Sequence, residues 1–105
     1  MTARQFLTKV SQTGCEAVVS LSGELDVATS PELSEALVAL IDGGSTELVI
    51  DLGRLAFIDS TGLSAILKAN KKLEGRGRVV LRGPTPMVRQ VLEITGLTAA
   101  LFVEP

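Results

Sequence analysis

Apolar and polar positions form short blocks along the chain, and the spacing of the apolar positions changes from block to block. Two apolar-rich runs, Phe6–Val10 and Ala17–Leu21, flank the polar cluster Ser11–Gly14. Short apolar runs on either side of a polar cluster that contains glycine are typical of a β-hairpin. The chain is therefore expected to begin with two neighbouring strands.

After Asp26 the spacing becomes helical. Ser30, Pro31 and Glu32 have the features of a helix start, with serine as the N-cap, proline at the first helical position and an acid in the first turn. Apolar residues then recur three and four positions apart, which predicts one buried helix face. This face consists of Leu33, Ala36, Leu37, Leu40 and Ile41. The glycines at 43–44 are predicted to end the helix.

Two continuous apolar triplets, Leu48–Ile50 and Val79–Leu81, predict short buried strands. Residues 52–59 are expected to connect the first of these strands to a second helix. That helix is predicted to open at Ser60 and to stop at residues 75–77, which contain two glycines. Its apolar face consists of Leu63, Ile66, Leu67 and Leu73.

A third helix is predicted over Pro84–Glu93, with Gly96 as its C-cap. Its inner face consists of Met87, Val88, Val91 and Leu92. Leu101–Val103 is either a last strand or a tail that packs on the core. Two strands followed by alternating helices and strands predict an α/β fold. We expect one domain over residues 1–105, with a mixed β-sheet of four to five strands and three or more helices packed on it.

Composition narrows the classes of function. Apolar residues make up 46% of the chain and the net charge is −2, as in ordinary globular proteins that attract neither nucleic acid nor an anionic membrane. A lone Cys15 cannot form an internal disulfide, and no apolar run is long enough to span a bilayer, so we expect a cytoplasmic protein. Because the chain has no histidine, common catalytic triads and zinc sites are disfavoured. We expect no catalytic residue, metal ion or cofactor.

Three acids lie at the predicted ends of elements: Asp26 and Asp51 after strands, and Asp59 before the second helix. The carboxyl ends of parallel strands are where sites gather in α/β sheets, and Ser60 belongs to the same region. Aspartate and serine also favour turns and helix caps for local reasons, so both readings stay open.

Ser60 taken alone is a helix N-cap. Two residues later, Gly62 costs about 1 kcal/mol relative to alanine in a helix, and its small size leaves room for another protein to approach the backbone. Leu63 is either a core residue or an exposed contact, with the core favoured.

The stretch Leu55–Leu63, with Leu48–Asp51 and Gly23–Asp26 before it, resembles a STAS domain and, more narrowly, the bacterial anti-sigma factor antagonists. The resemblance covers nearly the whole chain. It implies a mixed sheet with helices, and it places Ser60 at the family's phosphorylated serine and Thr61 at a secondary acceptor position.

The same resemblance implies the partners. Asp26 matches an acid beside the phosphorylation site. The partner-binding set that the resemblance and its surroundings suggest is Asp26, Asp59, Ser60, Thr61, Gly62 and Leu63. The unphosphorylated form is expected to bind an anti-sigma factor that is itself an ATP-dependent serine kinase, which frees the sigma factor. Phosphorylation of Ser60 is expected to abolish that binding, and a metal-dependent serine phosphatase is expected to reset the switch.

Two other functions remain open. The first keeps the fold and makes the chain a STAS subunit of a transporter or lipid-trafficking complex that is never phosphorylated. The second is a nucleotide hydrolase that uses Asp26 and Asp59. The missing histidine and the absence of a glycine-rich phosphate loop with its lysine speak against the hydrolase.

Overall fold

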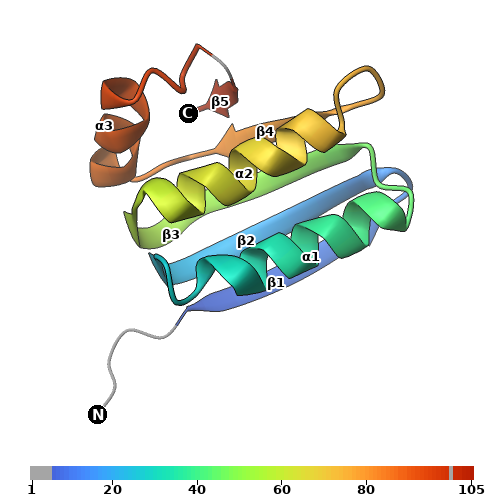
Figure 1. The fold of residues 1–105 in the computed structure, drawn as a ribbon, viewed down its shortest axis with the longest axis horizontal. Helices are drawn as coiled ribbons and strands as arrows, with labels where there is room; N and C mark the ends of the chain where they lie inside the picture. Colours follow the sequence, from blue (N-terminus) through green and yellow to red (C-terminus); the bar gives the residue numbers. More distant parts are fainter. Residues whose placement is uncertain (1–5, 100) are drawn as a thin grey trace.

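The computed structural model describes residues 6–99 and 101–105, which form a five-stranded sheet and three helices (Figure 1). In chain order the elements are β1 (Leu7–Thr13), β2 (Glu16–Leu25), α1 (Ser30–Asp42), β3 (Glu47–Ile58), α2 (Ser60–Lys72), β4 (Arg78–Arg82), α3 (Pro86–Ile94) and β5 (Phe102–Glu104). The predicted α/β fold, with a mixed sheet and three helices, is confirmed. Of the two readings of the C-terminal run, the strand is correct.

The N-terminal hairpin is also confirmed, with a tighter turn than the polar cluster suggested. β1 and β2 are antiparallel, and Thr13 pairs with Glu16 across a turn of only two residues, Gly14 and Cys15. Gly14 has φ 61°, which suits the first central position of a type II′ hairpin turn. Ser11 belongs to the strand, so polarity alone misplaced the turn.

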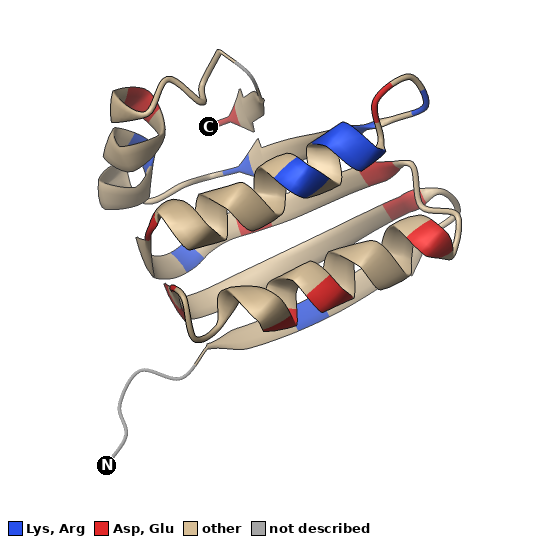
Figure 2. Ribbon diagram, in the orientation of Figure 1, with Lys and Arg blue, Asp and Glu red and all other residues tan. Residues whose placement is uncertain are grey.

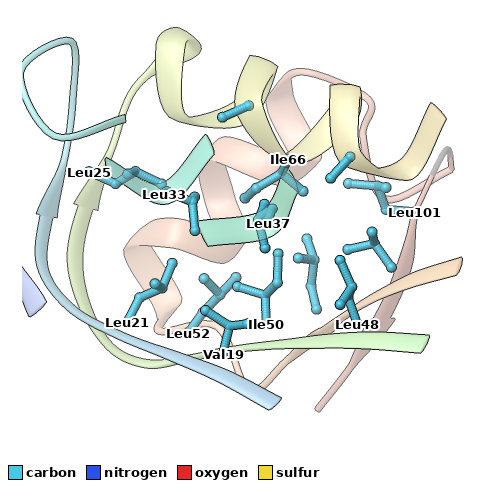
Figure 3. Close-up of a cluster of buried hydrophobic side chains, with 14 of the residues drawn as sticks. Val19, Leu21, Leu25, Leu33, Leu37, Leu48, Ile50, Leu52, Ile66 and Leu101 are labelled. Atoms are coloured by element: carbon cyan, nitrogen blue, oxygen red, sulfur yellow. The ribbon is translucent and has the colours of Figure 1, made fainter. Parts of the chain in front are cut away.

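The strands follow one another across the sheet in chain order, and the pairs β2–β3, β3–β4 and β4–β5 are parallel. Each parallel crossover passes through a helix, and Figure 1 shows α1 and α2 side by side over one face of the sheet. Side chains from β2, β3, β4 and all three helices meet in one aliphatic core, part of which is drawn in Figure 3. Leu37 and Ile66 from the helices lie there above Ile50 from β3.

β3 differs most from expectation, because the predicted connector over residues 52–58 is strand. Leu52, Leu55 and Ile58 all reach the core although they are three residues apart. Two shifts in the register of β2 against β3 each insert one extra residue into β3, and such β-bulges turn a spacing of two into a spacing of three. The strict alternation expected of a strand therefore fails here.

The helix starts needed smaller corrections. The N-cap of α1 is Thr29 and not Ser30, and α3 begins at Pro86 behind the capping hydroxyl of Thr85. The side chain of Met87 is 42% exposed and not part of the core. Gly96 follows the C-cap residue of α3 with φ 78°, which is the usual place for a glycine just beyond a helix end.

Candidate functional site

The carboxyl ends of β2 and β3 bring two of the predicted acids together. Leu25 and Ile58 are partners in the parallel register, and Asp26 and Asp59 are the residues that directly follow them. The backbone N–H of Asp59 donates to the carbonyl oxygen of Leu25 at 3.2 Å. Neighbouring strands lie about 4.8 Å apart, so the two acids and Ser60 share one end of the sheet.

Asp51 does not belong to this group. It lies within β3, where its partners in the ladder are Ser20 on one side and Arg82 on the other. Its carboxylate accepts the backbone N–H of Gly53 at 3.0 Å. Because β3 continues seven residues further, Asp51 is roughly 20 Å from Asp59, and the prediction that it closes its strand is wrong.

Asp59 is the N-cap of α2, so the assignment of Ser60 as the cap is wrong. The Asp59 carboxylate accepts the backbone N–H groups of Thr61 at 2.9 Å and Gly62 at 3.2 Å, together with the Thr61 hydroxyl. The Thr61 hydroxyl is the main cause that holds the pKa of Asp59 below its usual 3.8. Partial burial opposes the lowering of this pKa, and the two N–H groups support it. Asp59 is therefore a carboxylate at neutral pH.

The Asp26 carboxylate also accepts hydrogen bonds from backbone N–H groups. It accepts the N–H groups of Ala28 at 3.0 Å and Thr29 at 3.1 Å, which shapes the turn that leads into α1. Both carboxylates are thus held by backbone donors and present a fixed negative charge at this end of the sheet. Figure 2 shows an acidic segment at the cap of α2, a basic segment on the nearby part of β3, and basic segments further along α2, whose last turn contains Lys71 and Lys72.

Ser60 and Thr61 differ in how available their hydroxyls are. Ser60 is the first residue of α2 and is exposed. Within residues 6–99 and 101–105 its hydroxyl forms no hydrogen bond, whereas the half-buried hydroxyl of Thr61 donates to Asp59. A hydroxyl group that acts as a nucleophile must be reachable and free to lose its proton, and Ser60 fits this better than its neighbour.

Gly62 has an internal reason to be glycine. A Cβ at this position would lie 2.6 Å from Cγ of Leu25 and 3.2 Å from Cγ1 of Ile58. The close approach of the first turn of α2 to the sheet therefore leaves no room for a side chain, and the expected room for another protein is taken by this chain's own core. Leu63 is 4% exposed, so the core reading of this residue is correct.

Sequence reasoning missed two exposed apolar side chains beside the site. Val27, 70% exposed, directly follows Asp26, and Phe57, 38% exposed, precedes Asp59 by two residues. The β-bulges of β3 turn Phe57 outward, and no sequence pattern marked them.

In the described part of the chain, no three His, Cys, Asp or Glu side chains lie close enough to hold a metal ion. No helix there is long and apolar enough to cross a membrane.

Comparison with known proteins points to one family. The family model described as "Mlab, STAS domain" matches residues 8–104. BtrV of Bordetella bronchiseptica, provisionally named an anti-sigma factor antagonist, is 39% identical over 80 residues, which cover 75% of this chain and 69% of BtrV.

Two solved proteins share the fold closely. An anti-sigma factor antagonist from Mycobacterium paratuberculosis is 31% identical with a TM-score of 0.88, and the match covers 96% of this chain and 86% of that one. The anti-sigma factor antagonist SpoIIAA in its unphosphorylated form is 28% identical with a TM-score of 0.81, covering 92% and 87%. SpoIIAA from Bacillus in its phosphorylated form is 27% identical with a TM-score of 0.73, covering 92% and 90%.

Proposed function

This chain belongs to the STAS domain family, and on that premise we propose that it is an anti-sigma factor antagonist switched by phosphorylation of Ser60. The unphosphorylated protein binds an anti-sigma factor that is a serine kinase and so releases the sigma factor. The phosphorylated protein does not bind, and a metal-dependent serine phosphatase restores it. The names of the relatives support the antagonist role, and the phosphorylated form of SpoIIAA supports the switch.

The observation that carries the proposal is the exposed hydroxyl of Ser60 at the first position of α2. A phosphate there would carry about −1.5 to −2 charges at neutral pH. The partial positive charge of the helix N-terminus favours such an anion by about 0.3–1 kcal/mol, so the modified protein stays folded. Thr61 is the weaker acceptor because its hydroxyl is already engaged with Asp59.

The same phosphate is costly in a closed interface. The Asp59 carboxylate is adjacent and Asp26 follows the neighbouring strand, so the surroundings of the phosphate on this chain are acidic. Burying a doubly charged group without a dedicated cation costs several kcal/mol. A loss of about 3–4 kcal/mol weakens binding by about 100- to 1000-fold, which is enough for a switch without any change of fold.

The surface that meets the kinase is proposed to be the end of the sheet around Ser60. Asp26, Asp59, Ser60 and Thr61 present polar groups there, and the exposed Val27 and Phe57 add apolar contact. Gly62 and Leu63 are buried under this surface and would contribute indirectly, by setting the position of the first turn of α2.

Phosphate transfer tests the proposal. The purified chain is incubated with ATP and each candidate anti-sigma kinase, and mass spectrometry locates the phosphate. We expect one phosphate on Ser60, none in Ser60→Ala, and an unchanged amount in Ser30→Ala, which alters the serine that begins α1. A phosphate on Thr61 or Ser30 would contradict the assignment. Recovery of a transporter ATPase in place of a kinase, from the chain used as bait, would favour the transporter-subunit alternative.

A further inference from the structure

We propose that β1 is a self-association edge, along which two copies of this chain pair antiparallel and continue one sheet across both molecules. The two edges of the sheet are unequal: β5 has three residues, whereas β1 has seven. β1 pairs with β2 through seven consecutive partners without a register shift, so it contains no bulge, and it contains no proline. Bulges, prolines and short length are three of the devices that protect a sheet edge, and a charged side chain is another. Of these four devices β1 has only the last, in Lys9.

Within residues 6–99 and 101–105, no element covers the outer side of β1. Every residue of the strand except Thr8 is exposed, and Thr8 is half-buried. Figure 1 shows β1 at the border of the sheet, with no described element beyond it. An exposed strand edge presents unpaired N–H and C=O groups that another strand can satisfy.

The turn determines which backbone groups point outward. In a hairpin with a two-residue turn, the residues that flank the turn, here Thr13 and Glu16, exchange backbone hydrogen bonds. Bonded and non-bonded pairs alternate along an antiparallel ladder. The outward N–H and C=O groups of β1 therefore belong to Thr8, Val10 and Gln12.

One register satisfies all of these groups. An antiparallel pair centred on Val10 places Val10 opposite its own counterpart and Thr8 opposite Gln12 of the second copy. Registers shifted by one or two residues leave Thr8 or Gln12 without a partner. Charge agrees with the same choice, because Lys9 then faces Ser11 of the second copy, whereas a pair centred on Lys9 would oppose two lysines.

This arrangement is compatible with partner binding. A two-fold axis through Val10 points the carboxyl ends of β2 in the two copies in opposite directions. The two Ser60 sites then lie at opposite ends of the continued sheet, and each stays accessible. One strand from each copy makes a small contact, which belongs with weak and transient interfaces.

A disulfide tests the register. In a Cys15→Ser background, Val10→Cys places two thiols across the axis, with Cα atoms about 5.5 Å apart in a bonded pair, which lies within the range that a disulfide spans. We expect an oxidised dimer on a non-reducing gel. Lys9→Cys in the same background is the matched control, because Lys9 faces Ser11 and not itself. Equal cross-linking of both variants, or none with Val10→Cys, overturns the proposal.

Sedimentation equilibrium tests the strand pairing itself. Val10→Pro removes an outward N–H and leaves the bonds between β1 and β2 intact, so the fold is retained, as circular dichroism would check. We expect the dimer to weaken by about tenfold or more relative to Val10→Thr, which keeps the N–H. A wild-type chain that is monomeric up to about 1 mM, or association that Val10→Pro leaves unchanged, contradicts the proposal.

Discussion

The two long helices, α1 and α2, begin with similar sequences, but the side chains at their first turns have different surroundings. α1 and α2 each begin with a serine, and each follows a strand whose next residue is an aspartate. Asp26 is separated from Ser30 by three residues, whereas Asp59 directly precedes Ser60. Neither serine hydroxyl has a hydrogen-bond partner within residues 6–99 and 101–105, so a free hydroxyl does not distinguish them.

Exposure and the position of the helix do distinguish them. Ser30 is half-buried and its backbone N–H donates to the carbonyl oxygen of Asp26 at 2.8 Å, which ties it into the turn. Ser60 is exposed, because Asp59 caps the helix from one residue away and Gly62 lets the first turn settle on Leu25. Helix starts with similar sequences therefore differ in the exposure of their first serine, through the length of the connection and the packing beneath it.

The largest expected effect is the loss of binding when a negative charge is introduced at Ser60 and not at Ser30. Ser60→Asp should weaken binding to the cognate anti-sigma kinase by about 100- to 1000-fold, because a negative charge is buried in the interface. Ser30→Asp should change the affinity by less than about threefold, since Ser30 belongs to a different helix start. Isothermal titration calorimetry measures both. Wild-type affinity in Ser60→Asp would refute the role of this serine.

The next effect concerns the packing beneath α2. Gly62→Ala should lower the free energy of unfolding by about 1–2 kcal/mol, because strain against Leu25 outweighs the better helix propensity of alanine. Glu32→Ala, which alters an exposed side chain at the equivalent position of α1, should change it by less than about 0.5 kcal/mol. Urea unfolding followed by circular dichroism compares them, and a stabilised Gly62→Ala variant would show that the close approach is not tight.

A smaller effect concerns the cap of α2. Asp59→Ala should lower the free energy of unfolding by about 1 kcal/mol at pH 7, through loss of the bonds to Thr61 and Gly62. Because the folded pKa of Asp59 is lowered, its ionic contribution is complete well above pH 3.8 and is lost as the pH falls through the folded value.

The pH dependence checks this cap directly. The difference between wild type and Asp59→Ala should shrink as the pH falls below 3.8. Asp59→Asn keeps a side-chain acceptor without a titrating charge, so its difference from Asp59→Ala should not change with pH in this range. A difference between wild type and Asp59→Ala that stays constant down to pH 2 would contradict the lowered pKa.

The smallest expected effect is at the acid that the fold sets apart. Asp51→Asn should leave the affinity for the anti-sigma kinase within about twofold of wild type, because Asp51 lies within β3 and not at its end. Asp26→Asn removes a charge beside Ser60, and it should lower the affinity by more than Asp51→Asn does. If Asp51→Asn weakened binding as much as Asp26→Asn, the interface would have to reach along the sheet.

The sequence by itself determined the element order, the aliphatic core and the region of the site. Helical spacing identified α1 and α2, and the run Asp59–Leu63 drew attention to Ser60. These features are local or compositional, so neighbouring residues suffice to specify them.

Only the tertiary structure decided what depends on a neighbouring strand. The bulges of β3 exist only against β2, and they extended the strand and removed Asp51 from the group of acids. The same pairing set Asp26 beside Asp59. Packing on Leu25 explained Gly62, whose reason lies 37 residues away along the chain. Contacts between residues far apart in sequence leave no periodic signal, so the pairing of Asp26 with Asp59 and the reason for Gly62 became visible only when the sheet was assembled.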